Sequence, residues 1–403
     1  MYLCLHSASR WRNGAVHLGI DECLGAPRAG VSLRIGLRAG AARFTAVGAL
    51  CRQPNPAAIA SPRHVPESDF MDRKPTGVLP AARTPFLKWL ETRPDIIAVH
   101  FQEWALWLAA PLIRRIRRSG RKVFYTVHNV LPHHYPAMVP RAMVHRWIHR
   151  ACMQCDGLFV HTDRLAGELA DFLGGLHPPI HIVPHGVWTV RSELRLPALE
   201  ERLAWKKLLF FGSIRRNKGL DLLLRAADLL PGYSITIAGE PHERQYYETQ
   251  CLPLIRQLRD RGVRIELLDR FIREDEVGPL FASHSAVVLP YTKDFVAQSG
   301  VLFMALAYDL PVVASEAGGL REMLRDFPVG SICRGETPEA LAAAVSALFD
   351  TAAQAGLAGQ IRQAKRRLSW HEAARATLAG YSVAFDSQQV RENDCAIETI
   401  AAG

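Results

Sequence analysis

A basic turn between an apolar run and a helix-forming segment is the clearest chemical feature of the sequence. In "LLFFGSIRRNKGLDLLLRAA" the apolar run 208–211 ends at Gly212, and Lys218 and Gly219 lead into the next apolar segment. Glycines let a backbone turn and approach a ligand closely, while Lys218 and Arg215 carry the charge that a phosphate near a helix N-terminus requires. The alternative is a basic surface turn that binds no ligand.

Two further junctions of the same kind follow in the second half of the chain. "AVVLPYTKDFVAQSG" places Ser299 and Gly300 at the head of an apolar helix, and "EAGGLRE" offers another glycine turn into a helix. Backbone N–H groups at helix starts favour anions, so several of them with a lysine in one crevice predict a diphosphate site. The residues expected there are Gly212, Arg215, Lys218, Gly219, Arg270, Ser299, Gly300, Gly318, Gly319 and Glu322.

The elements that position these residues alternate regularly along the chain. Short apolar strands such as "DIIAVHF", "KVFYTVH", "GLFVHT" and "IHIVPHG" alternate with helical segments, and the alternation restarts at "KLLFFGS" after a strandless stretch, 189–206. This pattern predicts α/β architecture with two Rossmann-like, doubly wound domains that face each other across a cleft. We expect domains at 1–190 and 191–370, followed by a C-terminal helix that crosses back to the first domain and a frayed tail, 371–403.

Composition is that of a globular protein. The 403 residues are 49% hydrophobic and 22% charged, with no apolar run long enough for a transmembrane helix. The N-terminus lacks the apolar core of a secretory signal. Of eight scattered cysteines only Cys152 and Cys155 form a CxxC pair, which we interpret as two helical cysteines in a reducing cytosol rather than a metal site.

The net charge of +10 belongs to the first half of the chain. Residues 1–190 carry 23 Lys and Arg against 12 Asp and Glu, whereas 191–403 carry 26 against 27. In "RAMVHRWIHR", 141–150, apolar residues recur at helical spacing with Arg and His between them. Such a helix either lies on an anionic membrane or packs on its own domain with a solvated basic face. No signature of nucleic-acid binding accompanies the charge, and we expect no nucleic-acid partner.

Taken in order, these motifs resemble those of the GT-B glycosyltransferases of the group 1 and family 4 type. The segments that carry the resemblance are "G-x-I-R-x-x-K-G", "ITIAG", "LPVVAS" and "GGLRE" in the second half, with "YTVHNVLPHH", "FVHTDRLAGEL" and "IVPHGVW" in the first. The first-half segments look closest to bacterial exopolysaccharide enzymes, including xanthan-type mannosyltransferases. The resemblance covers about 95–350, and the first 62 residues do not share the usual opening of the family.

The resemblance implies roles for particular residues. Lys218 matches the lysine that neutralises the donor diphosphate, and Arg215 substitutes for a family arginine whose position is Ser213 here. His128 matches the histidine that ends a strand and faces the donor sugar, with Asn129 and His133 after it. The alternative for His128 is a satisfied core histidine.

The chain departs from the family at two acidic positions. Retaining members carry two glutamates eight residues apart, and alignment on "LPVVAS" places Val296 and Met304 there. Met304 cannot accept hydrogen bonds from a ribose, and a lost acceptor forfeits roughly 1–3 kcal/mol unless it is replaced. We expect Ser299 and backbone N–H groups to take over, with Glu322 as the remaining carboxylate near the site.

Two mechanisms remain open at this stage. An inverting transfer needs a general base in the first domain, and Glu103 in "HFQEW" and Asp163 in "VHTD" follow strand ends, Glu103 being preferred. A retaining transfer needs no such base, because the donor phosphate takes the proton; we favour inversion slightly. We expect Lys218, Arg215 and helix N-termini to stabilise the negative charge of the leaving diphosphate. We expect no metal and no cofactor other than the nucleotide-sugar substrate.

The resemblance therefore implies a hexosyltransferase that uses a GDP- or UDP-sugar, with an acceptor-binding first domain and a donor-binding second domain. We expect a glycan or lipid-linked oligosaccharide acceptor in bacterial exopolysaccharide assembly, and a cytoplasmic protein peripheral to the inner membrane leaflet. Two alternatives are a non-catalytic GT-B subunit that partners an active enzyme and, less favoured, a GT-B-fold sugar-nucleotide epimerase.

Overall fold

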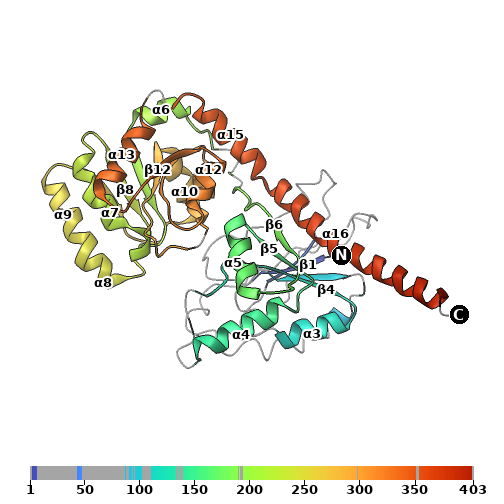
Figure 1. The fold of residues 1–403 in the computed structure, drawn as a ribbon. Helices are drawn as coiled ribbons and strands as arrows, with labels where there is room; N and C mark the ends of the chain where they lie inside the picture. Colours follow the sequence, from blue (N-terminus) through green and yellow to red (C-terminus); the bar gives the residue numbers. More distant parts are fainter. Residues whose placement is uncertain are drawn as a thin grey trace, which may run out of the picture.

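The computed structural model contains two α/β lobes, each built on a six-stranded sheet (Figure 1). It describes residues 2–6, 43–47, 87, 90–92, 94, 96–101, 110–132, 135, 139–188, 190, 194–296, 298–350 and 354–401. All strands of the first sheet precede residue 183 and all strands of the second follow residue 206.

The first sheet has the strand order β2-β1-β3-β4-β5-β6, and only the β1–β2 pair is antiparallel. The strands are β1 (Tyr2–His6), β2 (Arg43–Val47), β3 (Ala98–Phe101), β4 (Lys122–Thr126), β5 (Gly157–Val160) and β6 (Ile180–Ile182). Parallel neighbours place the carboxyl ends of β3 to β6 along one edge, where ligands of such sheets bind.

The first sheet is covered on both faces, which explains its uninterrupted apolar strands. In β4, Val123 and Tyr125 join the core formed with the helices on one face, whereas Phe124 faces the other side and packs against Tyr381 of the C-terminal helix. The helices of the first face are α3 (Ala110–Arg118), α4 (Arg141–Cys152) and α5 (Asp163–Leu173). Cys152, the last residue of α4, and Cys155, in the turn after it, are buried free thiols in this core, so only the first of the two is helical as predicted.

The second sheet has the order β12-β11-β10-β7-β8-β9, and every pair is parallel. Because β7 and β10 are neighbours, the junctions that follow them meet at one edge. Its strands are β7 (Lys207–Phe211), β8 (Ser234–Ala238), β9 (Arg264–Leu268), β10 (Ala286–Leu289), β11 (Val312–Ser315) and β12 (Gly330–Cys333).

Helices cover both faces of the second sheet (Figure 1). Between α8 and α9 the chain forms a π-helical turn, η4 (Tyr247–Cys251). The helices are α6 (Leu199–Ala204), α7 (Leu220–Ala226), α8 (Arg244–Tyr246), α9 (Leu252–Asp260), α10 (Glu274–Ala282), α11 (Gly300–Ala307), α12 (Leu320–Asp326), α13 (Pro338–Leu348) and α15 (Leu357–Arg367).

The strandless stretch 189–206 contains α6 and a fully buried arginine. Arg202 is 0% exposed and donates to the backbone oxygens of His284 at 3.1 Å, Tyr308 at 2.7 Å and Phe281 at 2.6 Å. Burial lowers the pKa of this guanidinium to about 10, so it stays charged at neutral pH. Three carbonyl acceptors compensate its desolvation and attach α6 to the second domain.

The C-terminal helix α16 (Trp370–Ala401) follows α15 and crosses to the first sheet (Figure 1). Tyr381 anchors it there: its hydroxyl lies 2.6 Å from Nδ1 of His100, whose Nε2 lies 2.8 Å from Oγ1 of Thr126. The helix continues through Ser387 to Ala401, over the segment that the sequence predicts to be a frayed tail. Among the described residues, no helix has the length and apolar character needed to span a bilayer.

Candidate functional site

The basic turn after β7 depends on two glycines. Gly212 follows the strand with φ 105°, and Gly219 has φ 64° after the short helix η2 (Arg216–Lys218). A Cβ on Gly219 would lie 1.9 Å from the backbone oxygen of Pro290, so only glycine fits against the loop after β10. The N–H of Thr292 also donates to the oxygen of Asn217 at 3.1 Å. These contacts fix the Lys218 turn against the neighbouring loop.

Lys218 lies against two aromatic rings. Its Nζ is 3.7 Å from the ring centroid of Tyr291 and 4.2 Å from that of Phe295, distances at which a cation is attracted to the ring face. Burial, and after it the charge of Arg215, lowers the pKa of Lys218 to about 7. The site therefore holds a desolvated amine beside a second cation, and no described residue forms an ion pair with Lys218. An incoming anion would supply the missing counter-charge.

The second junction begins α11. Ser299 is 3% exposed at the N-cap, yet its side chain makes no capping bond and instead lies 3.1 Å from the hydroxyl of Tyr291. A Cβ built on Gly300 meets nothing within 4 Å, so space is open beside the first residue of the helix. The N–H groups that begin this apolar helix receive no capping bond from the Ser299 side chain, and uncapped N–H groups of this kind favour an anion.

The third junction lies after β11, the strand beside β10. Gly318 has φ 53° and Gly319 precedes α12; a Cβ on Gly319 would lie 2.6 Å from Nε2 of Gln298 in the loop before α11. The junctions after β7, β10 and β11 therefore lie side by side, as the sequence predicts. Three buried polar atoms in these segments have no hydrogen-bond partner in the part of the chain that the structure describes: Oδ1 of Asn217, Oγ1 of Thr292 and Oγ of Ser315. Unpaired buried polar atoms are rare and fit a place that a polar ligand occupies.

Arg270 is the predicted residue least integrated into this group. It follows β9, the edge strand, and its guanidinium pairs with both carboxylate oxygens of Glu276 at 2.9 and 2.6 Å. Its role at the anion site stays a prediction that the geometry does not favour.

Three histidines end adjacent strands of the first domain. His128 follows β4, His161 follows β5 and His185 follows β6; ring centroids are 5.1 Å apart between His128 and His161 and 5.4 Å between His161 and His185. The last ring stacks on Phe303 of α11 at 4.2 Å, so the row runs from the first domain to the second. We did not predict a role for His161 or His185 from the sequence, although both directly follow apolar strands, as His128 does.

Two of these imidazoles are neutral at physiological pH. Burial lowers the pKa of His161, and burial followed by the neighbouring His161 lowers that of His185 to about 4. Their Nδ1 atoms lie 3.0 Å from the backbone oxygens of Val183 and Gly186, so each donates from Nδ1 and leaves Nε2 as an acceptor. Nε2 of His161 has no partner among the described residues.

Arg164 joins the two domains at this edge. Its guanidinium donates to the backbone oxygen of Val296 at 3.1 Å and lies 3.7 Å from the carboxylate of Glu322, with Glu168 as a partner on its own helix. Glu322 is therefore near the junctions, as predicted, and is paired across the domains. Contacts between residues so far apart in sequence leave no local pattern, so sequence reasoning missed Arg164.

The remaining predicted residues have different outcomes. Asp163 is the exposed first residue of α5, next to Arg164. Glu103 and His133 lie outside the described residues. Val296 is half exposed and Met304 packs against the core of the second domain, so neither former glutamate position carries an acceptor side chain. The described residues that could meet an anion are therefore the cations and helix starts at the strand ends of the second domain.

Two family models match the chain in succession. One described as Glycosyltransferase Family 4 matches residues 35–191, and one described as Glycosyl transferases group 1 matches 205–351. A D-inositol 3-phosphate glycosyltransferase of Xylanimonas cellulosilytica is 30% identical over 250 residues, 59% of this chain and 59% of that protein. The same enzyme of Mycobacterium avium is 29% identical over 241 residues, 57% and 55% of the two chains. The chain thus matches less than two thirds of these relatives.

Solved structures share the fold. A glycosyltransferase from Rickettsia africae superposes with TM-score 0.59 at 14% identity, covering 78% of this chain and 84% of the other. HepE of Anabaena, solved in complex with UDP, superposes with TM-score 0.56 at 17% identity, covering 75% and 81%. These likenesses confirm the predicted two-domain fold.

Proposed function

We propose that this chain, which belongs to the GT-B glycosyltransferases of group 1 and family 4, transfers a hexose from a nucleoside-diphosphate sugar to a glycan acceptor. The observation that carries the proposal is the convergence of Lys218, Ser299 and the Gly319 turn at neighbouring strand ends, with unpaired buried polar atoms among them. The UDP complex of HepE supports UDP or a similar nucleoside diphosphate as the nucleotide part of the donor.

Leaving-group stabilisation is the chemistry this site supplies. As the bond between sugar and diphosphate breaks, negative charge grows on the phosphate oxygens; Lys218, Arg215 and the N–H groups at the start of α11 meet it. His128, whose ring lies 5.1 Å from that of His161 in the first domain, is proposed to contact the donor sugar. Glu103 is proposed as the base of an inverting transfer and Asp163 as the substitute, while a retaining transfer would use the donor phosphate itself.

The donor panel that tests the proposal contains GDP-mannose, UDP-glucose, UDP-glucuronate and UDP-N-acetylglucosamine. Calorimetric titration of the full chain should show saturable binding of at least one of them, and release of nucleoside diphosphate should follow when an acceptor is added. Lys218→Ala should abolish binding, whereas Lys207→Ala, at the opposite end of β7, should leave it unchanged. His128→Ala should lose transfer, with His177→Ala as its control. No binding to any donor by the wild type would overturn the proposal.

A non-catalytic subunit is the second candidate, and one observation favours it: the two family glutamate positions hold Val296 and Met304. A donor that binds but is neither hydrolysed nor transferred, with or without acceptor, would favour this candidate. The epimerase alternative predicts interconversion of two UDP-sugars without any acceptor, so the same donor panel tests it.

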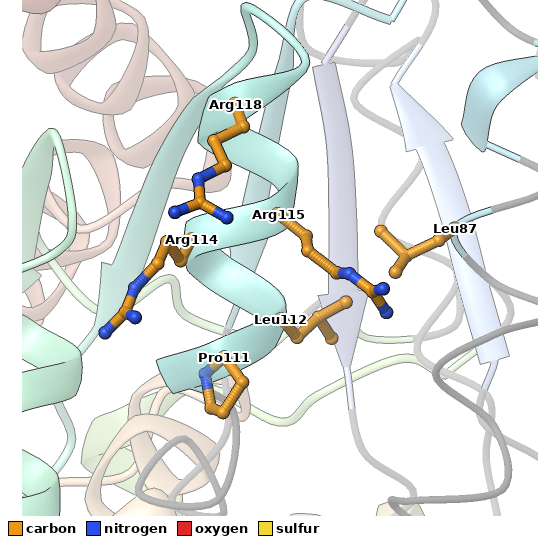
Figure 2. Close-up of a pocket in the computed structure, with 6 residues that line it drawn as sticks. All are labelled: Leu87, Pro111, Leu112, Arg114, Arg115 and Arg118. Atoms are coloured by element: carbon orange, nitrogen blue, oxygen red, sulfur yellow. The ribbon is translucent and has the colours of Figure 1, made fainter.

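We propose that the acceptor is lipid-linked and is used in exopolysaccharide assembly at the cytoplasmic face of the membrane. Its support is the basic surface of α3 and the neighbouring α4. Figure 2 shows Arg114, Arg115 and Arg118 projecting from α3 around a pocket of about 240 Å³. None of the three forms an ion pair with a described residue, whereas Arg117 pairs with Asp156 at 3.1 Å.

Unpaired arginines on a helix surface fit anionic headgroups, each worth about 1 kcal/mol near a charged bilayer. Reversal of Arg114, Arg115 and Arg118 to Glu should abolish co-sedimentation with phosphatidylglycerol vesicles. An equal reversal in the second domain, at Arg244, Arg256 and Arg362, should not. Equal loss of vesicle binding in both variants would show that net charge alone explains the binding. It would contradict a membrane-binding surface on α3.

A further inference from the structure

Tyr291 lies between the two groups that are proposed to bind the donor diphosphate. It follows β10 and Pro290, is 1% exposed, and contacts Lys218 with its ring and Ser299 with its hydroxyl. The two contacts are 3.7 Å from Nζ to the ring centroid and 3.1 Å from hydroxyl to Oγ. A single side chain therefore touches residues that belong to two different strand-to-helix junctions.

The backbone around Tyr291 is held in place independently of any ligand. The Gly219–Pro290 approach and the Thr292–Asn217 hydrogen bond fix its loop against the Lys218 turn. Phe295 packs on the Tyr291 ring, with centroids 4.5 Å apart, and closes the other side of the amine. The ring position is thus set before a donor arrives, which is what preorganisation of a binding group requires.

The hydroxyl of Tyr291 keeps Ser299 away from its usual role. A serine at an N-cap ordinarily accepts from an N–H of its own helix, and here that bond is absent. Because Ser299 is held by Tyr291 instead, the helix N–H groups stay available for an external anion. Loss of the phenolic hydroxyl would free Ser299 to cap its own helix and to compete with that anion.

We propose that Tyr291 is a positioning residue of the donor site, which sets the relative placement of the Lys218 amine and the Ser299 hydroxyl for one diphosphate. The proposal rests on the proposed function and goes beyond it by assigning a role to a buried tyrosine that itself need not touch the donor. Phe295 completes the aromatic enclosure of the amine but has no hydroxyl with which to hold Ser299.

A double-mutant cycle tests the hydroxyl. Tyr291→Phe keeps the ring over Lys218 and should weaken binding of UDP or GDP, whichever the wild type binds, about fivefold, the effect of one hydrogen bond. In a Ser299→Ala background the same change should cost less than about twofold, because the partner is already missing. Tyr233→Phe, which alters a partly buried tyrosine that packs on Phe349, should have no effect and controls for general loss of a hydroxyl. Equal losses in the two backgrounds would overturn the proposal.

The ring contact is measured without any donor. The ε-methylene protons of Lys218 should show an upfield ring-current shift in NMR spectra of the full chain, retained in Tyr291→Phe and reduced in Tyr291→Leu to the part that Phe295 supplies. Thermal denaturation of each variant checks that it folds. An unshifted Lys218 signal in the wild type would overturn the proposal while the proposed function stands. A shifted signal with no binding of either nucleotide would instead overturn the proposed function and, with it, the role of Tyr291 at a donor site.

Discussion

Donor binding should weaken as the pH rises above about 7, because Lys218 must be charged to pair with the diphosphate. In the free protein, burial and Arg215 lower the pKa of Lys218 to about 7 from an ordinary 10.5. A bound diphosphate reverses that shift, so above pH 7 each binding event takes up a proton. Affinity should then fall about tenfold per pH unit, or about thirtyfold between pH 6 and pH 8.5.

The assay is calorimetric titration of a nucleotide sugar into the full chain between about pH 6 and about pH 8.5, in two buffers that differ in ionisation enthalpy. The diphosphate of a nucleotide sugar keeps its charge over this range, so a slope reports the protein. Lys218→Arg is the matched control: a guanidinium stays charged, and the slope should vanish whatever the affinity at pH 6. A pH-independent affinity of the wild type, or an equal slope in Lys218→Arg, would refute this reasoning.

The same shift predicts how stability depends on pH. Between about pH 7 and the ordinary pKa of 10.5, the unfolded chain binds a proton at Lys218 that the free folded protein does not. The contribution of Lys218 to the free energy of unfolding therefore rises with pH in this window. At pH 7 the charged amine opposes folding, so the site trades stability for binding.

Three shorter predictions concern other parts of the molecule. Arg202→Met should lower the free energy of unfolding by about 3 kcal/mol or more in chemical denaturation, because three buried carbonyls lose their donor; a loss below about 1 kcal/mol would contradict the role assigned to α6. Arg164→Gln should raise the donor KM severalfold while changing the melting temperature little, since its partners lie across the domains and it is partly exposed; an unchanged KM would remove Arg164 from the site. Transfer activity should survive EDTA, and a loss restored by Mn²⁺ or Mg²⁺ would show that the metal-independent expectation is wrong.

The sequence predicted the layers of the fold because both faces of each sheet are buried. Strands such as β4, in which Phe124 faces α16 and Val123 faces the opposite core, read as continuous apolar runs between helices. Neighbouring parallel strands end at one edge, so Lys218, Ser299 and Gly319 could be brought together from their strand-end positions alone.

Long-range side-chain contacts could not be predicted in this way. The Arg164–Val296 contact and the stacking of His185 on Phe303 depend on how the two domains approach each other, which no local spacing records. The sequence places Tyr291 in a loop after a strand, and no local pattern indicates that its ring packs on Lys218. The helix α6 was missed because its apolar residues are few, and its place in the fold depends on the buried guanidinium of Arg202.

A structure of the full chain in complex with the nucleotide sugar that it binds is the most direct test of the proposed donor site. We expect the diphosphate to lie between Nζ of Lys218 and the N–H groups at the start of α11, with the sugar directed toward His128. A nucleotide bound elsewhere, for example beside Arg270 with the Lys218 amine still enclosed by its two aromatic rings, would contradict it.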